Sequence, residues 1–197
     1  MGQPARAEPL AACAVGFCDD HGFPHFGGLA RVALGHATAL NGQPEEGVTI
    51  IRAGLLHLAE IGSRLGTTHH LTLLADAQVV GGAFDSALDT TEECLQANSE
   101  EPTYRPETLR PRGEVHRTRN QIELAEADFL ESLRCARAIG AKAWELRAAT
   151  SLARLEHGRG ARARARDLLT PLYSSFTEGF GTRDLIAARE LLARIGS

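Results

Sequence analysis

The fold is decided by residues 141–180, which read AKAWELRAATSLARLEHGRGARARARDLLTPLYSSFTEGF. Apolar side chains recur three or four positions apart in the first part of this stretch, which places them on one side of a helix. They are Trp144, Ala148, Leu152 and Leu155. After the corner Gly158-Arg159-Gly160, a second apolar stripe runs from Ala165 to Phe176. Two stripes joined by so short a corner predict an antiparallel helix pair.

A further helix is expected after this pair. Glu178-Gly179-Phe180-Gly181 ends the second stripe, and Thr182 is a suitable N-cap. The helix would carry the apolar side chains Leu185, Ala188, Leu192 and Ile195. We expect it to close the end of the core.

Turn residues recur at a nearly constant spacing along the chain. They are Gly42, Gly82, Asn120 and Gly160, at steps of 40, 38 and 40 residues. Glycine and asparagine accept the left-handed conformation of a tight turn. Five positions after each turn stands a small residue that lets two helices approach closely. These residues are Gly47, Ala87, Ala125 and Ala165.

This period predicts an all-α, right-handed solenoid of about four helix hairpins, with the first helix of each pair on the concave side. The other helices are expected at residues 26–40, 45–62, 71–80, 84–97, 109–119 and 123–139, after a leading helix from Leu10 to His21.

Prolines set the expected irregular segments. Pro102 and Pro106 predict a loop from Asn98 to Pro106, and Pro111 is expected in the first turn of the helix over 109–119. Residues 1–9 show no periodicity and are expected to be disordered, so that residues 10–197 form a single repeat domain.

The composition is that of a globular protein without a general affinity for polyanions. The net charge of -4 gives no attraction to nucleic acid or to an anionic membrane. The sequence has no signal peptide, no apolar run of membrane-spanning length and no disulfide spacing among its four cysteines, so we expect a cytoplasmic protein. Lys142 is the only lysine and lies outside any phosphate-loop pattern, which favours a solvated helix start.

Several stretches resemble the C-terminal helical-repeat region of bacterial adenylate cyclase-like and predicted-ATPase regulatory proteins. The resemblance is carried by residues 141–155, by Leu168-Leu169-Thr170-Pro171-Leu172-Tyr173 and by residues 176–180, with weaker similarity at residues 21–24, 42–47 and 74–75. It implies tetratricopeptide-like repeats that serve as an accessory part of a signalling protein. Pro106 and Pro111 depart from the uninterrupted helix of that family, and the sequence contains neither a cyclase nor an ATPase motif.

Two groups of residues have the composition of metal ligands. Cys13, Cys18, His21 and His25 are spaced C-x4-C-x2-H-x3-H, but the central gap is far shorter than that of a zinc finger, and Phe17, Phe23 and Phe26 favour core packing nearby. His69-His70, with His57, is better explained as a solvated helix start because adjacent helical residues point to different sides. We therefore expect no metal and no cofactor.

The remaining candidates are interaction residues. Arg159, Arg162, Arg164 and Arg166 form a basic run, which we interpret as a solvated helix face rather than a nucleic-acid site, since no aromatic residues interleave. Trp144 is expected to anchor the core, while Glu145 and Arg147 are expected to pair with a neighbouring repeat or with Glu178. The full candidate set is Trp144, Glu145, Arg147, Arg154, Glu178 and Phe180.

These patterns predict a binding module and not an enzyme, because no nucleophile, base and acid recur at a mechanistic spacing. The expected partner is a protein or peptide in the concave groove, with self-association through the uncovered N-terminal edge as a further possibility. A small-molecule sensor that modulates an ATPase partner is the alternative, and nucleic-acid binding through the basic run is a third.

Overall fold

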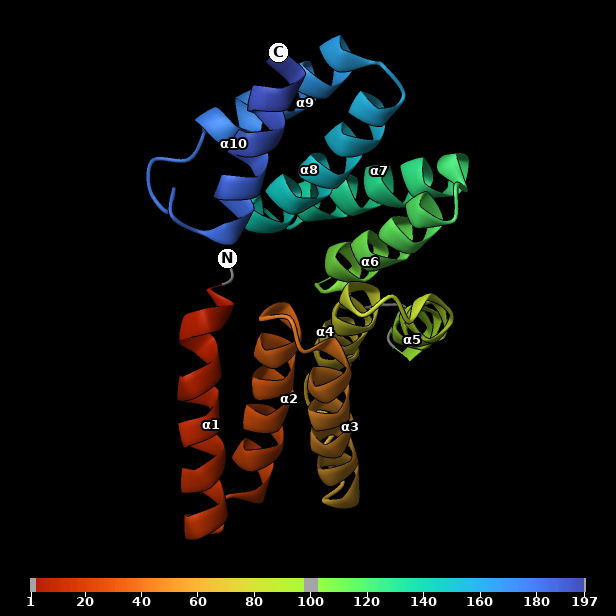
Figure 1. The fold of residues 1–197 in the computed structure, drawn as a ribbon. Coiled ribbons are helices and arrows are strands. Elements are labelled where there is room, and N and C mark those ends of the chain that lie inside the picture. The colour runs from red at the N-terminus through yellow and green to blue at the C-terminus, as the bar shows by residue number, and fades with distance from the viewer. Residues whose placement is uncertain (1–2, 98–102, 197) are drawn as a thin grey trace. The chain divides into compact units, whose positions relative to one another are not determined.

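The computed structural model describes residues 3–97 and 103–196, and in this part of the chain it contains α-helices and no strand (Figure 1). The helices are α1 (Pro4–His21), α2 (Pro24–Leu40), α3 (Pro44–Glu60), α4 (Thr67–Val80), α5 (Phe84–Ala97), α6 (Arg105–Thr118), α7 (Ile122–Ala138), α8 (Lys142–Gly158), α9 (Arg162–Ser174) and α10 (Arg183–Gly196).

The helices belong to two compact units, which are described separately. The N-terminal unit covers residues 3–99 and holds α1 to α5, and the C-terminal unit covers residues 100–197 and holds α6 to α10. Successive helices pack against each other within each unit, and α2 also contacts α4, as α8 contacts both α6 and α10. That residues 10–197 behave as a single domain stays a prediction.

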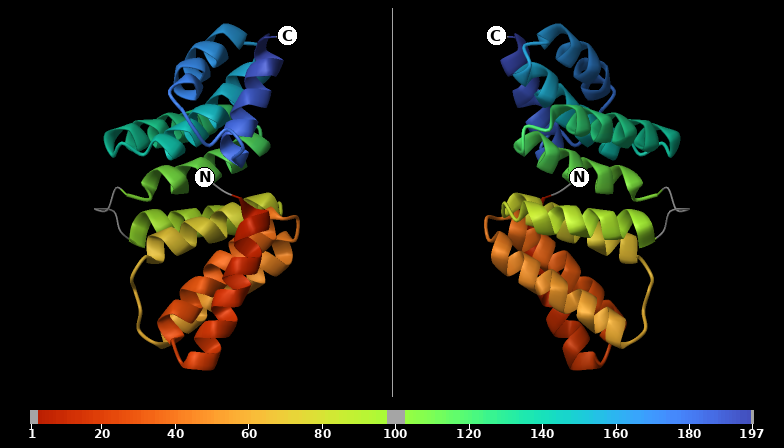
Figure 2. Two further views of the ribbon diagram at one scale, coloured as in Figure 1. Left: turned by 90° about the vertical axis from the view of Figure 1, so that its left-hand side faces the viewer. Right: turned by 90° about the vertical axis from the view of Figure 1, so that its right-hand side faces the viewer.

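The four predicted hairpins are present as α2/α3, α4/α5, α6/α7 and α8/α9, with α1 before them and α10 after them (Figures 1 and 2). The turn residues have positive φ as expected: 100° at Gly42, 73° at Gly82, 58° at Asn120 and 81° at Gly160. The all-α helical-hairpin fold predicted from the 40-residue period is therefore confirmed.

Each of these turns is a Schellman motif, in which the N–H after the left-handed residue bonds to a carbonyl in the last helical turn. The donors and acceptors are Gln43 and Thr38 at 3.2 Å, Ala83 and Gln78 at 2.9 Å, Gln121 and His116 at 2.8 Å, and Ala161 and Glu156 at 2.9 Å. The same motif joins α1 to the first hairpin at Gly22, and one hairpin to the next at Gly62 and Gly140, with distances that are all 2.9 Å. The turns within pairs were predicted, whereas those at Gly62 and Gly140 were not.

Several helices begin earlier than expected. Helix α1 begins at Pro4 instead of Leu10, so part of the start that was expected to be disordered is helical. Helix α6 begins at Arg105, which places Pro106 in the first turn and Pro111 in the interior, contrary to both expectations. Proline suits a first turn because the N–H there has no helical partner. Residues 98–102 of the predicted loop lie outside the described residues.

Helix α2 packs through glycine as well as through apolar side chains. Val32, Gly28 and Gly35 are buried, whereas Ala33 is exposed. Glycine carries no hydrophobic signal, so the periodicity of apolar residues did not predict the glycine contacts. In the C-terminal unit the core lies between α7, α8, α9 and α10 and includes Leu146, Leu169, Leu185 and Leu191.

Candidate interaction surface on the first helices

Helices α6 and α8, which begin their hairpins, and the closing helix α10 lie side by side, with α8 in contact with the other two. These three are called the first helices of the C-terminal unit, and the surface that they form is called the first-helix face. Because each is separated from the next by an antiparallel helix, the three run in the same direction. Residues one repeat apart therefore become neighbours across the surface.

Within the described residues, three contacts between an acidic and a basic side chain join positions one repeat apart. His36 and Asp76 lie 2.9 Å apart in the N-terminal unit. In the C-terminal unit, Glu107 and Arg147 lie 2.5 Å apart, and Glu114 and Arg154 lie 3.5 Å apart. His36, Asp76, Glu114 and Arg154 each stand six positions before the turn residue of their own pair, Gly42, Gly82, Asn120 or Gly160.

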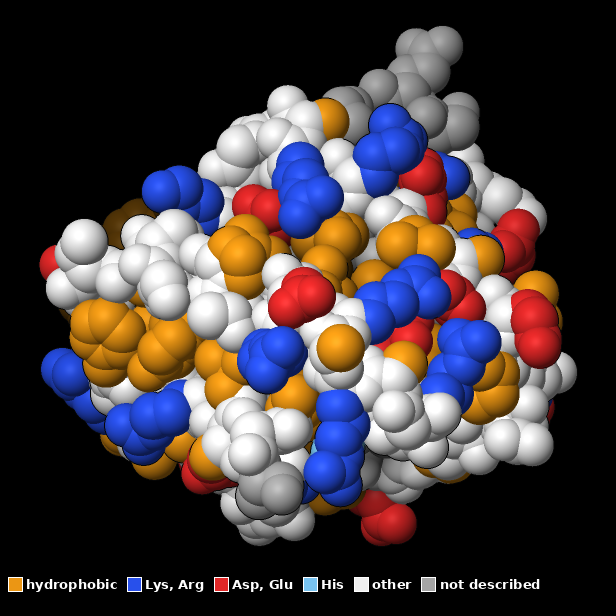
Figure 3. Space-filling view, turned by 90° about the horizontal axis from the view of Figure 1, so that it is seen from above, with side chains coloured by type: hydrophobic (Ala, Val, Ile, Leu, Met, Phe, Trp, Pro, Cys, Tyr) orange, Lys and Arg blue, Asp and Glu red, His pale blue; other side chains and the backbone are white. Residues whose placement is uncertain are grey.

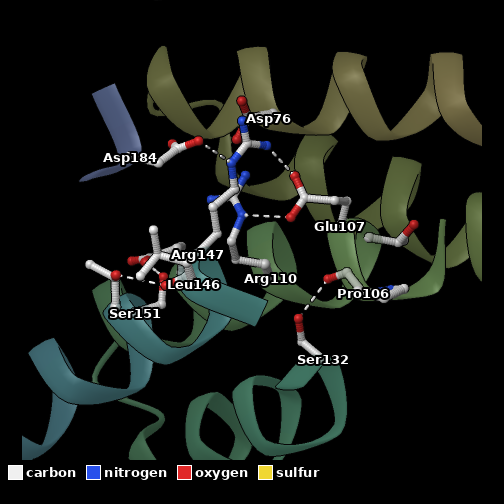
Figure 4. A network of polar contacts seen from close by, with 12 residues as sticks. Asp76, Pro106, Glu107, Arg110, Ser132, Leu146, Arg147, Ser151 and Asp184 are labelled. Atoms are coloured by element: carbon white, nitrogen blue, oxygen red, sulfur yellow. Dashed lines mark hydrogen bonds and ion pairs between the residues drawn. The ribbon is translucent and has the colours of Figure 1, made fainter. Parts of the chain in front are cut away.

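Arg147 links all three first helices of the C-terminal unit (Figure 4). Its Nη1 donates to Glu107 of α6, and its Nε donates to Asp184 of α10 at 3.0 Å. Arg110 lies 3.6 Å from the other oxygen of Glu107. Burial works against the charged form, but the carboxylates of Glu107 and Asp184 outweigh it and raise the pKa of Arg147. Arg147 therefore remains a cation and holds these helices together.

Glu114 forms a second polar centre on the same face. Ser151 donates to its carboxylate at 2.6 Å, and Arg117 donates at 2.8 Å. Burial raises the pKa of Glu114, but these hydrogen bonds and the charges of Arg117 and Arg154 prevail and lower it. One carboxylate is thus shared by two guanidinium groups.

Arg154 lacks full charge compensation. Burial lowers its pKa, and the nearby cations Arg117, Arg194 and Arg110 lower it further, against the single favourable contribution of Glu114. The side chains of Arg154 and Arg117 are 40% and 36% exposed, so both are accessible from outside. An additional carboxylate or similar anion at this place would improve the local electrostatics.

The contacts around Arg147 and Glu114 form a polar cluster of Glu107, Glu114, Arg117, Arg147, Arg154 and Asp184. The other candidate residues do not belong to it. Trp144 is half-buried and lies against Tyr104, with ring centroids 5.7 Å apart, so the expectation that it anchors the core was wrong. Leu146 fills the core in its place. Glu145 accepts from Arg137 at 2.6 Å.

Two more candidates lie after helix α9. Glu178 and Phe180 are both exposed, and Phe180 packs edge-on against Tyr173. Arg147 was expected to pair either with a neighbouring repeat or with Glu178. The structure shows the first alternative, since Arg147 pairs with Glu107 of the preceding repeat and with Asp184 of α10. That these residues bind a partner stays a prediction.

The basic run from Arg159 to Arg166 is largely matched by acidic neighbours. Arg159 and Arg164 both donate to Glu126, at 2.6 and 3.1 Å, and Arg164 also lies 3.1 Å from Glu156. Arg166 lies 3.8 Å from Asp167. On the face that Figure 3 shows, basic side chains are interspersed with acidic and apolar ones. Such a surface provides no uniform field for a nucleic-acid backbone.

The histidines that have the composition of metal ligands form hydrogen bonds to other groups of the protein. His21 hydrogen-bonds to the carbonyl of Phe17, His25 to Ser63, and His57 to the carbonyl of Pro24. Cys13 is exposed whereas Cys18 is buried. Within residues 3–97 and 103–196, no three His, Cys, Asp or Glu side chains are placed to hold a metal ion.

Two expectations for this region were wrong. Phe17, Phe23 and Phe26 are exposed and do not pack in a core. His70 is buried and not solvated, because α4 begins at Thr67, one turn earlier than expected, and turns this residue inward. Lys142 is exposed at the start of α8, as expected.

Sequence reasoning missed Glu107, Glu114 and Asp184, although each provides a carboxylate to the cluster. A signal was available, since residues of opposite charge stand 40 positions apart at 107 and 147 and at 114 and 154.

No helix within the described residues is long and apolar enough to cross a membrane.

Comparisons with known proteins show the fold. No protein-family model and no curated protein matches the sequence. The chain is similar to the crystal structure of BtubC (BKLC) from P. vanneervenii, with a TM-score of 0.72 and 16% identity over 99% of this chain and 84% of that one.

Two further similar structures are of "putative kinesin light chain nearly identical TPR-like repeats" from Podosopora anserina, one of them a variant with a single substitution. Their TM-scores are both 0.60, at 17% and 18% identity, over 84% of this chain and 83% of theirs. At such identities the similarity shows a tetratricopeptide-like helical-repeat fold.

Proposed function

We propose that this chain is a non-catalytic interaction module whose first-helix face in the C-terminal unit binds an acidic segment of a protein partner. The observation that carries the proposal is the Glu114 centre, in which one carboxylate is shared by Arg117 and Arg154 and both guanidinium groups are accessible. A carboxylate of the partner would supply the missing negative charge, and charge-assisted hydrogen bonds to arginine are among the stronger polar contacts.

The scaffold beneath this site supports the proposal. Arg147 is fixed by Glu107 and Asp184 on both neighbouring first helices, so α6, α8 and α10 present Arg117 and Arg154 from a preorganised surface. A rigid surface loses little conformational entropy on binding, which favours recognition of an extended or helical segment.

Binding of labelled peptides tests the proposal. Fluorescence anisotropy would compare a glutamate-rich peptide with a lysine-rich peptide of equal length, and we expect the intact chain to prefer the acidic one with an affinity that falls as salt is added. Arg154→Gln should weaken binding about tenfold, because a hydrogen bond to a charged group contributes about 1.5 kcal/mol.

Arg134→Gln is the matched control. Arg134 lies on the second helix α7 and is paired with Glu131 at 2.7 Å, away from the first-helix face. Equal affinities for the two variants, or no preference for the acidic peptide, would refute the proposal.

We further propose that the partner belongs to a bacterial signalling assembly of the ATPase or cyclase type and that the chain acts in the cytoplasm. The support is the sequence resemblance at residues 141–155, 168–173 and 176–180. Co-purification with an ATPase encoded beside this chain tests this proposal. If the ATPase retains the Arg154→Gln chain as well as the natural chain, its binding does not depend on the acidic-segment site, and the two proposals are separate.

A further inference from the structure

Helix α1 has one face packed against α2 and the opposite face uncovered. The side chains turned toward α2 are at least partly buried and include Ala11, Val15 and Cys18, and Glu8 accepts hydrogen bonds from Thr38 and Asn41 of α2. In Figures 1 and 2, α1 lies at the edge of the N-terminal unit, and no other helix of that unit covers its outer side.

The uncovered face carries a regular stripe of exposed residues. Its members are Arg6, Leu10, Cys13, Phe17 and Asp20. Their spacing of four, three, four and three residues places them in one line along a helix, as in the seam of a coiled coil. Leu10 is 71% exposed and Phe17 is 54% exposed, which is a large apolar surface for a single helix to leave in water.

The order of residue types in the stripe makes it complementary to the same stripe on a second, antiparallel helix. If a second copy of α1 lies antiparallel with Cys13 at the centre, Leu10 meets Phe17 of the other copy and Arg6 meets Asp20. The same contacts occur on both sides of the axis, which is the requirement of a twofold interface. Large apolar side chains then flank a small central residue, and opposite charges close both ends.

The placement of the charges also needs an explanation beyond the isolated helix. Arg6 stands in the first turn of α1 and Asp20 in the last turn. The helix dipole disfavours a cation at the N-terminal end and an anion at the C-terminal end. The arrangement costs the single helix stability, whereas in an antiparallel pair it brings Arg6 close to Asp20 of the other copy.

We propose that two copies of this chain associate through an antiparallel pairing of their α1 helices, with the two Cys13 side chains adjacent on the twofold axis. This association uses a different surface from the acidic-segment site and does not depend on it. A single helix pair buries a small area, so the dimer is expected to be weak and in rapid exchange.

Cysteine cross-linking provides a direct test. Cys13 is the exposed cysteine, and Cys18, Cys94 and Cys135 are buried, so a short bismaleimide should join two chains through Cys13. The matched control carries Cys13→Ser and Ala12→Cys, which moves the exposed thiol one residue along and about 100° around the helix. We expect a covalent dimer from the natural chain and at least tenfold less from the control. Equal yields from the two chains would overturn the proposal.

A charge exchange provides the second test. Arg6→Asp should weaken dimerisation about tenfold in sedimentation equilibrium, because two like-charged contacts replace two attractive ones, and Asp20→Arg should do the same. The chain with both substitutions should dimerise as well as the natural one. Arg6→Asp places an anion near the N-terminus of α1, and Asp20→Arg places a cation near its C-terminus. The helix dipole favours both charges, so a loss of folding does not explain a weakened dimer. A natural chain that stays monomeric at all concentrations, or a double variant that is not restored, would overturn the proposal.

Discussion

The backbones of Gly35 in α2 and Gly47 in α3 touch where the two helices cross. A Cβ atom added to Gly35 would lie 2.4 Å from the carbonyl oxygen of Gly47, and one added to Gly47 would lie 2.4 Å from the carbonyl oxygen of Gly35. Gly28 and Gly54 form a second close contact of the same two helices, seven residues away along each. The first hairpin thus depends on glycine for its helix separation.

Gly35→Ala is expected to destabilise the N-terminal unit by about 3 kcal/mol, because the new methyl group forces two backbones apart. The measurement is urea unfolding followed by circular dichroism. Gly16→Ala is the control, since Gly16 is also helical but an added Cβ meets nothing within 4 Å. There the helix propensity of alanine should raise the free energy of unfolding by up to about 1 kcal/mol. Similar losses in both variants would contradict the close-contact explanation.

The hairpin count and the turn positions could be predicted because each turn needs a residue that tolerates positive φ, and such residues recur at a spacing of 38 to 40 positions. The small residue at position 47 was also predicted, but its partner Gly35 was not. Helix contact through glycine has no hydrophobic signature, so the periodicity of apolar residues could not identify Gly28 and Gly35 as buried contact residues of α2.

The candidate site was less predictable for a related reason. Arg147 and Arg154 were identified, whereas Glu107, Glu114 and Asp184 were not, because a charged residue on a helix is usually solvated and only the packing of α6, α8 and α10 brings these together. The exposure of Phe17 and Phe26 also escaped prediction, since it depends on which face of α1 and α2 has a neighbour.

Asn120 is the one non-glycine residue with positive φ within the described chain, at 58°. Asn120→Gly should raise the free energy of unfolding by a few tenths of a kcal/mol, up to about 1, because glycine adopts this conformation without Cβ strain. Asn120→Ala should lower it by about 1 kcal/mol, and Asn120→Val should lower it further. Chemical denaturation of the three variants gives the ranking, and an alanine variant as stable as the glycine variant would contradict it.

His70 makes stability sensitive to mild acid. Burial, together with the charges of His69 and His25, lowers the pKa of His70 from 6.5 to about 4. The unfolded chain therefore takes up a proton at His70 below pH 6.5, whereas the folded chain does so only near pH 4. The contribution of neutral His70 is complete above pH 6.5 and is lost as the pH falls toward 4, by at most about 3 kcal/mol.

His70→Gln removes this titration. Unfolding free energies of the natural chain and the variant, measured between pH 7.5 and pH 4, should show the natural chain losing stability relative to the variant as the pH falls. The difference above pH 7 serves as the internal control, because His70 is neutral there in both states. A difference between the two chains that stays constant with pH would show that His70 is not the responsible group.

The pair formed by Glu107 and Arg147 should contribute more to stability than an exposed pair of the same chemistry. Glu107 is 8% exposed and Arg147 is 26% exposed, whereas Arg134 in the pair with Glu131 is 68% exposed. Two double-mutant cycles, built from Glu107→Gln with Arg147→Met and from Glu131→Gln with Arg134→Met, measure the coupling energy of each pair. We expect about 2 kcal/mol for the first pair and a much smaller coupling energy for the second, since water screens the exposed one. Because Arg147 also bonds to Asp184, Arg147→Met should cost more than Glu107→Gln. Equal coupling energies in the two cycles would mean that Arg147 does not hold the first helices together, and the preorganised surface beneath Arg154 would lose its physical basis.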